Sequence, residues 1–480
     1  MSVADWEPVI GLEVHCQLAT ATKLFSACEL QRLAPPNTLV DEFTLGLPGT
    51  LPVVNEAAVR SAVALAVALG CDVQPRSRFA RKHYFYPDLP KGYQTTQGSE
   101  PYARGGSVQI PGDPPHRVRL IRIHMEEDAG KNVHVPGEDV SLLDFNRAGA
   151  PLLEIVSEPD IRSGAEAAAY LRELRSIVRF LGISEANMEE GTLRCDANVS
   201  LRRRGTTELG TRCEIKNLNS FRFLAQAIGA EIRRQADILD DGGQVQMATM
   251  SYDADRDLTR VMRTKEEAAD YRYLPEPDLP PLSIPAEWVE TMRAQQPALP
   301  AALRAKWMAA EVSEADAELL SSEPDLAAYF EAMIGAGAPA KKAANWVTIE
   351  LLAKLRSDER TLADCRVQPE HLAELIGLVE DGTLSQRAAK QVFFTAYDEG
   401  LAPATIAERD GHRQVSDPAK LRAIVAEVLA ASEKQLAQYR AGKTALRSYF
   451  VGQVMKKTRG QANPKVVSDL LDELLPGADE

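Results

Sequence analysis

The sequence predicts an α+β protein in which a front half of mixed strands and helices precedes an all-helical back half. Between residues 9 and 160, short apolar runs are separated by glycine and proline turns, a pattern typical of strands and loops. Prolines then crowd residues 275–300, and beyond them the pattern is one of short helices separated by Gly, Pro and Asp. Because 480 residues are too many for a single core, several domains are expected.

The first predicted strand covers residues 9–17. Its even-numbered positions are apolar, whereas its odd-numbered positions include Gly11, Glu13 and His15, which is the alternation of a half-buried strand. Neighbours on one face of a strand stand about 6.5–7 Å apart, close enough for a carboxylate and an imidazole to share a metal ion or ligand. The alternative is a surface strand whose polar face holds Glu13 and His15 without function.

Capping residues and apolar periodicity predict the other elements of the front half. Helices are expected over residues 55–69, 163–180 and 221–239, and strands around 118–123, 194–202 and 212–216. The proline-rich stretch 275–300 is expected to be an extended segment or linker.

Composition restricts the class of protein and its compartment. The formal net charge of −14 argues against an all-over electrostatic hold on nucleic acid. There is no long apolar run, and the first residues are acidic rather than a basic signal region, so no membrane segment is expected. The six cysteines include no C-x-x-C pair, which predicts a reduced, cytoplasmic protein without disulfides.

The final segment departs from this acidic balance. No Asp or Glu occurs between Gln435 and Ser468. The basic residues of this segment are Arg440, Lys443, Arg447, Lys456, Lys457, Arg459 and Lys465. Such a segment is typical either of a contact with a phosphate backbone or of a solvated helix face, and composition leaves both interpretations open.

Carboxylates elsewhere could join the first strand in one site. Glu126 and Glu127 follow a strand-like run, and Glu154 stands alone inside an apolar run. A buried charge such as Glu154 must be paired or metal-bound, and Arg147 or Arg194 could supply an ordinary ion pair. Oxygen ligands with one imidazole and no cysteine cluster favour Mg²⁺ or Mn²⁺ over zinc.

Residues 81–93 gather cations and aromatic rings in one loop, a mixture that suits a nucleotide. The rings would stack on the base, and Lys82 or Lys91 would contact phosphates.

The chain has no P-loop, no G-x-G-x-x-G after a strand and no recognisable serine or cysteine nucleophile motif. We therefore expect a nucleotide site of another class and no machinery for hydrolysing an amide.

Taken together, these stretches resemble the B subunit of the tRNA-dependent Asp/Glu-tRNA amidotransferase, the GatB family. The matching runs follow the family's order through the whole chain, at residues 9–15, 34–38, 45–49, 82–94, 126–131, 146–160, 188–202, 214–221 and 270–280. The basic end is similar to the YqeY-like domain of the family. The resemblance implies a mixed-sheet catalytic cradle domain over 1–295, an all-α helical domain over 296–408 and an all-α YqeY-like, tRNA-binding tail over 409–480.

The resemblance also implies an activity. It is the ATP-dependent phosphorylation and then amidation of the side-chain carboxylate of Glu-tRNA(Gln), Asp-tRNA(Asn) or both. Ammonia would come from a glutaminase partner, the family's A subunit, with a small C subunit completing a heterotrimer, and the cognate aminoacyl-tRNA synthetase is a further partner to consider. Two alternatives stay open: a non-catalytic tRNA-binding scaffold, and a metal-dependent ligase for a free amino acid, which would leave the basic tail without a role.

Roles for single residues follow from the resemblance. The catalytic residues and metal ligands would be Glu13, His15, Glu127 and Glu154, with Glu126 as a further metal ligand because sequence alone does not separate adjacent carboxylates. ATP would be bound with Mg²⁺ or Mn²⁺ by Lys82, Lys91 and Arg147. Many relatives also carry a zinc-binding C-x-C and C-x-x-C set. Here only Cys28 remains of it, so structural zinc is not expected and packing must hold that loop.

Overall fold

The structure is a computed structural model that describes residues 5–112, 115–135, 137–264, 270–415, 417–458 and 461–475. The chain divides into two compact units, Met1–Leu303 and Arg304–Glu480. The first unit holds a large sheet with helices, and the second is built from helices, so the predicted order of an α+β part and an all-α part is confirmed. The domain boundaries near residues 295 and 408 stay predictions.

Strand β1 (Trp6–Gln17) lies in the middle of the main sheet, between β11 (Pro151–Ser157) and β12 (Leu193–Arg203). The strand order is β15-β14-β13-β12-β1-β11-β8-β6-β2, and β7 pairs with β8 beside this path. Neighbours run antiparallel except for β13 and β14. The other strands are β2 (Asp72–Val73), β6 (Ala103–Arg104), β7 (Ser107–Ile110), β8 (His116–Glu127), β13 (Cys213–Leu218), β14 (Ala248–Asp253) and β15 (Leu258–Thr264).

The register of the central strands aligns polar residues that are distant in sequence. His15 on β1 lies opposite Glu154 on β11 and Arg194 on β12. Glu154 in turn lies opposite His124 on β8. Because directly opposite residues of antiparallel strands share a face, these four side chains form one row across the centre of the sheet.

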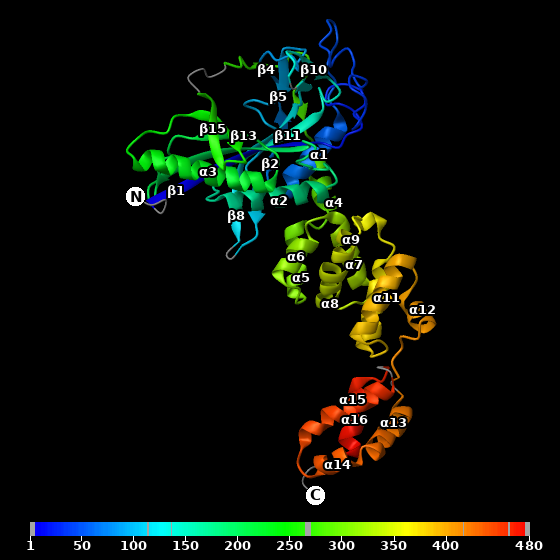
Figure 1. Cartoon of the computed structure of the whole chain (residues 1–480). Helices are drawn as coiled ribbons and strands as arrows, with labels where there is room; N and C mark the ends of the chain where they lie inside the picture. Colours follow the sequence, from blue (N-terminus) through cyan, green and yellow to red (C-terminus); the bar gives the residue numbers. More distant parts are fainter. Residues whose placement is uncertain are drawn as a thin grey trace. The chain divides into compact units, whose positions relative to one another are not determined.

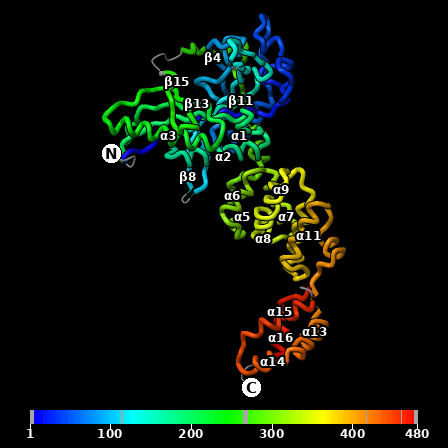
Figure 2. Tube along the Cα trace, viewed as in Figure 1, coloured from blue at the N-terminus to red at the C-terminus, as the bar shows by residue number. Residues whose placement is uncertain are grey.

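Two helices cover the other face of the sheet. Ile10, Leu12 and Val14 of β1 are fully buried there, in one core with α2 (Gly164–Phe180) and α3 (Phe221–Asp240). Figure 1 shows α2 and α3 along one side of the sheet, and their traces lie side by side in Figure 2. The predicted alternation of β1 between a core face and a polar face is therefore confirmed.

Side-chain caps begin the three predicted helices of this unit. Asn55 accepts hydrogen bonds from the first turn of α1 (Glu56–Ala68). Ser163 and Ser220 do the same for α2 and α3. All three helices are confirmed, with bounds within a few residues of the prediction.

Three small sheets complete the first unit, and Figure 1 shows β4 and β5 on the side of the main sheet away from α2 and α3. Their strands are β16 (Leu274–Pro275), β4 (Ala80–His83) and β5 (Tyr93–Thr96); β10 (Ser141–Asp144) and β9 (Lys131–His134); and β17 (Leu282–Ser283) and β3 (Arg76–Ser77). In the segment that leads to Cys28, the ring of Phe25 packs against the rings of Phe43 and Phe79.

The prediction of an extended segment or linker over residues 275–300 is wrong. β16 and β17 pair with β4 and β3, and α4 (Ala286–Gln295) packs on α1. Trp288 of α4 belongs to the core of the first unit. Pro275, Pro281 and Pro285 stand at or beside the ends of these short elements, where a missing N–H costs little.

The second unit is helical throughout its described residues, apart from one isolated bridge between Val415 and Ala462. From α5, which begins before the division between the units, its helices are α5 (Pro300–Ala309), α6 (Glu314–Leu320), α7 (Pro324–Gly335), α8 (Ala340–Asn345), a π-helix (Trp346–Leu351), α9 (Leu352–Ser357), α10 (Pro369–Glu380), α11 (Gln386–Glu399), α12 (Pro403–Arg409), α13 (Pro418–Ala431), α14 (Glu433–Arg440), α15 (Arg447–Lys457) and α16 (Pro464–Leu474). Short 3₁₀ turns span Leu362–Asp364 and Thr444–Leu446. No helix in the described part of the chain has the length and apolar character needed to cross a membrane.

Candidate active site

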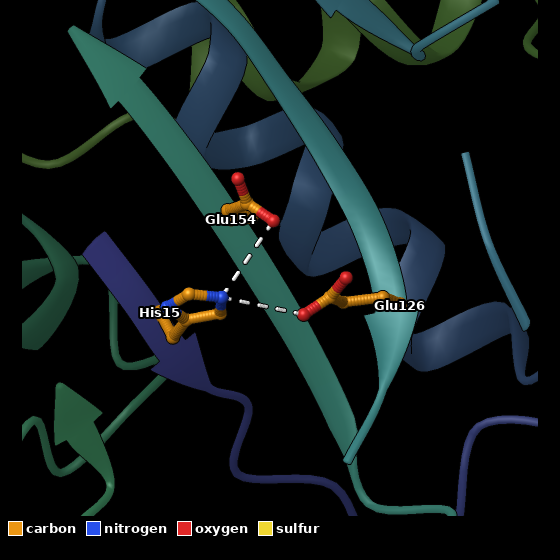
Figure 3. Close-up of side chains that lie close together, drawn as sticks. All are labelled: His15, Glu126 and Glu154. Atoms are coloured by element: carbon orange, nitrogen blue, oxygen red, sulfur yellow. Dashed lines mark ion pairs between the residues drawn. The ribbon is translucent and has the colours of Figure 1, made fainter. Parts of the chain in front are cut away.

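Three side chains from three strands converge on the polar face of the main sheet (Figure 3). His15 comes from β1, Glu126 from β8 and Glu154 from β11. His15 Nε2 lies 3.5 Å from Glu126 Oε1 and 3.6 Å from Glu154 Oε2. One ligand atom from each residue lies within 4.8 Å of the other two. The sheet thus joins three of the residues singled out from sequence into one cluster.

His124 adds a second imidazole to this cluster. It is buried, and its Nε2 lies 3.0 Å from Glu154 Oε2 and 3.6 Å from Glu126 Oε2. Burial alone lowers the pKa of His124, but the charges of Glu154 and Glu126 outweigh burial and raise the pKa to about 9. Burial opposes protonation of His15 as well, and the same two carboxylates raise its pKa. For Glu154, burial raises the pKa, but His124 and His15 hold it well below its usual range.

The cluster lines a cavity of about 830 Å³, a volume within the usual range of small-molecule sites. Glu13, two residues before His15 on the same face of β1, lines this cavity too, and its Oε1 accepts a hydrogen bond from Asn198 Nδ2 at 2.9 Å. Lys216 and Asp196 form a further ion pair in the wall, at 2.7 Å. The cavity therefore offers charges of both signs around the cluster.

The donor set of His15, Glu126 and Glu154 fits a hard divalent cation. Two carboxylates supply oxygen ligands, and an imidazole can complete the set once it has lost its proton. The two carboxylates are close together and largely buried, so their mutual repulsion must be compensated by positive charge, either protons on the two imidazoles or a metal ion. Mg²⁺ or Mn²⁺ could replace the protons at this place.

Glu127, the neighbour of Glu126, lies elsewhere. It accepts hydrogen bonds from Lys91 Nζ at 2.5 Å and from the Thr95 backbone N–H at 2.8 Å. Because successive side chains of β8 alternate between faces, Glu126 points to the cluster while Glu127 is held by Lys91. Neither Glu127 nor Lys91 is among the described residues that line the cavity.

The predicted ATP-binding cations do not all line the cavity. Lys82 lines the cavity, and its ammonium group lies 4.8 Å from the ring centre of Tyr271, which lines the cavity too. Arg147 lies outside the cavity lining and donates hydrogen bonds to the backbone carbonyls of Ala129 and Gly130. Of the three predicted cations, the geometry brings only Lys82 to the candidate site.

The arginine partners considered for Glu154 are engaged elsewhere. Arg194 lies 2.6 Å and Arg147 3.4 Å from Asp128 Oδ2. Glu154 instead meets the two imidazoles of His15 and His124. The interpretation of Glu154 as one half of an ordinary arginine ion pair is therefore wrong.

From sequence, His124 was placed in a candidate stretch without a role, and Arg122 was not considered, yet the structure brings both to this site. Both line the cavity, and with Glu126 they occupy every second position of β8. Within the described part of the chain Arg122 forms no ion pair, and its buried Nε has no hydrogen-bond partner. It also lies opposite Arg104 on β6, a like-charge pairing that a bound anion would relieve. The polar residues at every second position, 122, 124 and 126, could have indicated from sequence that these side chains share one face of a strand.

The basic tail contains charges of two kinds. Arg447 and Lys457 form ion pairs with Asp472 and Glu427 of the same helical cluster. The remaining described residues of this set are exposed and form no ion pair within the described ranges: Arg440, Lys443, Lys456 and Lys465. Arg459 lies outside the described residues.

Comparisons with known proteins agree with the division of the chain into a first unit with the main sheet and a helical second unit. The family model described as the GatB/GatE catalytic domain matches residues 8–290, and the one described as the GatB domain matches residues 328–475. A protein from Solidesulfovibrio magneticus is 50% identical over 98% of this chain and 100% of its own length, and one from Bordetella petrii matches equally. One from Persephonella marina is 48% identical over the same shares. All three are named as the B subunit of aspartyl/glutamyl-tRNA(Asn/Gln) amidotransferase.

Proposed function

This chain belongs to the family of aspartyl/glutamyl-tRNA amidotransferase B subunits, and we propose that its candidate active site phosphorylates and then amidates a carboxylate carried by tRNA. The substrate is the side chain of Glu-tRNA(Gln), Asp-tRNA(Asn) or both. The observation that carries the proposal is the buried cluster of His15, Glu126 and Glu154 in the wall of a cavity large enough for a nucleotide.

The reaction explains why such a site needs charges of both signs. A carboxylate is a poor acyl electrophile, so its oxygen first attacks the γ-phosphorus of ATP and ADP leaves. Ammonia then attacks the acyl carbon, and inorganic phosphate leaves with the C–O electron pair. Phosphoryl transfer depends mostly on positioning and on neutralising phosphate charge. The walls of the cavity would also protect the acyl phosphate from water.

We assign the groups of the site as follows. His15, Glu126 and Glu154 would hold Mg²⁺ or Mn²⁺, which when bound supplies positive charge to the phosphates. Lys82 and Arg122, which line the cavity without a carboxylate partner in the described part of the chain, would contact phosphate oxygens. Glu13 is fixed by Asn198 beside the cluster and would orient the reacting groups.

The name B subunit implies a complex of several different chains. We infer that an amidase chain, the A subunit of the family, supplies the ammonia and that a small C subunit completes the complex, because the sequence has no recognisable nucleophile motif for hydrolysing glutamine. The basic residues of the tail that form no ion pair within the described ranges would contact the tRNA backbone.

The proposal can be tested with Glu154→Gln in the assembled amidotransferase. We expect ATP-dependent phosphorylation of Glu-tRNA to fall by at least about a hundredfold, because the variant removes a charge that the site needs for phosphoryl transfer. Affinity for tRNA should change little. The exposed Glu138, outside the cavity, provides the control Glu138→Gln, which should retain full activity. Normal transamidation by Glu154→Gln would instead support a non-catalytic scaffold.

A further inference from the structure

A second cavity, of about 430 Å³, adjoins the candidate site along β1. Its lining includes Val9, Gly11 and Glu13, the positions of the polar face of β1 that lead to His15. Glu13, Asn198 and Arg212 line both cavities. Since same-face positions are about 6.5–7 Å apart, Gly11 stands about two such steps from the cluster around His15. We call this space the Gly11 cavity.

Gly11 leaves room in the floor of the Gly11 cavity. Its φ is not in the left-handed region, and a Cβ at this position would meet Ser157 O at 3.6 Å, an ordinary contact. The backbone conformation at residue 11 therefore does not require glycine. What the absence of a side chain provides is open volume in the Gly11 cavity, and a larger residue at this position would fill that volume.

The walls of the Gly11 cavity combine apolar side chains with an arginine. Ile121, Leu209 and Met247 are 41%, 61% and 44% exposed, and a gathering of large exposed apolar side chains around one pocket is typical of a ligand site. Arg212 stands where the two cavities meet. Within the described residues its guanidinium group has no ion-pair or hydrogen-bond partner, so it is available to stack on a base or to meet a phosphate.

We propose that the Gly11 cavity binds the terminal nucleoside of the aminoacylated tRNA, an inference that rests on the function proposed above. The amino acid is esterified to the ribose of that nucleoside. An extended glutamyl group separates its reacting carboxylate from the ester by only about 6 Å. With the carboxylate at His15, Glu126 and Glu154, the nucleoside must therefore lie in or beside the same cavity, and the Gly11 cavity continues from it past Glu13.

The charge distribution supports this choice of occupant. The main cavity holds the metal-ligating cluster together with Lys82 and Arg122, which suit a triphosphate. The Gly11 cavity has apolar walls for a base and Arg212 at its entrance. Each cavity then receives the ligand part whose chemistry it matches, and the two substrates meet at Glu13.

The test is Gly11→Val in the assembled amidotransferase, with Gly11→Ala as the milder substitution. Valine suits a strand and would occupy the floor of the Gly11 cavity without altering the cluster. We expect KM for Glu-tRNA to rise about tenfold, the effect of weakening one stacked base, while KM for ATP stays unchanged. Gly11→Ala should give a smaller change in the same direction, because its Cβ fits in ordinary contact.

Because Gly11→Val could act by distorting β1, a second variant changes the walls of the Gly11 cavity and leaves β1 unaltered. Leu209→Ala combined with Met247→Ala shortens two exposed wall residues and should also raise KM for Glu-tRNA. Leu142→Ala is the matched control, because Leu142 is 60% exposed but lies on β10 and lines neither cavity. A rise in KM for ATP alone would place the adenine of ATP in the Gly11 cavity and overturn the proposal, as would unchanged kinetics. Failure of the wild-type complex to phosphorylate Glu-tRNA would contradict the proposed function instead.

Discussion

At the scale of single residues, the candidate site depends on charges that compensate one another. Glu126 and Glu154 lie close together where water is scarce, and the two imidazoles of His15 and His124 lie within 3.6 Å of their oxygens. Each carboxylate favours protonation of the imidazoles, and each imidazolium favours ionisation of the carboxylates. A divalent cation entering the cluster would compete with these protons, so metal binding and proton release should be coupled.

This coupling predicts how stability depends on pH in metal-free buffer. The folded state raises the pKa of His124 from 6.5 to about 9. A group whose pKa is raised by folding adds most to the free energy of unfolding at pH values below its unfolded pKa. This stabilisation is lost as the pH rises through the folded pKa. Relative to His124→Gln, wild type should therefore lose free energy of unfolding between pH 6.5 and about 9. The loss should amount to at most about 3 kcal/mol.

Chemical denaturation of both proteins with EDTA at a series of pH values measures this difference. A difference that stays constant over the range would contradict the protonated state assigned to His124. Added Mg²⁺ should reduce the pH dependence, because the cation supplies the positive charge otherwise provided by the imidazolium groups.

The residue scale is also where sequence reasoning was incomplete. Glu13, His15 and Glu154 were recognised because they interrupt apolar runs or alternate with them. The choice between Glu126 and Glu127 depends on which face of β8 meets the cluster, and this is fixed by pairing with β11 rather than by neighbouring residues in sequence. His124 was left without a role for the same reason, since its partner Glu154 is on another strand.

At the scale of elements, α2 and α3 support the sheet that positions the site. They pack closely where α2 begins. A Cβ on Gly164 would lie 2.3 Å from the backbone oxygen of Ala225 in α3, which is too close for the helices to keep their spacing. The small residue at the start of α2 therefore sets the distance between the two helices.

Substituting the glycines of these helices should have opposite effects. Gly164→Ala should lower the free energy of unfolding by about 1–3 kcal/mol, because the helices must move apart. Gly229→Ala in α3 is the matched control, since its Cβ would meet only the flexible side chain of Arg233, at 3.6 Å. Because alanine is favoured over glycine in a helix interior, Gly229→Ala should raise the free energy of unfolding by about 0.5–1 kcal/mol. Denaturant titrations give both values, and a neutral Gly164→Ala would disprove the close packing.

Elements defined by local signals were predictable, whereas those defined by partners were not. Ser163 caps α2 and apolar periodicity runs through it, so its sequence alone predicts its bounds. Residues 274–283 contain two two-residue strands, β16 and β17, which exist only because β4 and β3 pair with them. Their prolines favoured a linker, and nothing in the local sequence shows that Trp288 packs into a core formed by residues far earlier in the chain.

At the scale of the whole molecule, charge is distributed unevenly. The chain carries a net charge of −14, yet the helical tail presents basic residues that have no acidic partner among the described residues. The tail has a core of its own, centred on Leu421, Phe450 and Leu471. Basic residues that lie outside this core can be changed with little effect on stability, so their role in binding can be measured separately.

The last prediction concerns the salt dependence of tRNA binding. A quadruple charge-neutralising variant would replace Arg440, Lys443, Lys456 and Lys465, the tail cations that form no ion pair within the described residues, by Gln. If each contacts a phosphate, the slope of log Kd against log salt concentration should decrease by about 3, since each phosphate contact contributes about 0.7–0.9.

The paired tail cations provide the control for this experiment. Arg447 and Lys457 are engaged by Asp472 and Glu427, so their replacement by Gln should alter the slope much less. Filter binding or anisotropy with Glu-tRNA between about 50 and 200 mM salt measures both slopes. Equal slopes for wild type and the quadruple variant would show that the basic tail is a solvated helix face, and the phosphate contacts would then have to be made by other residues.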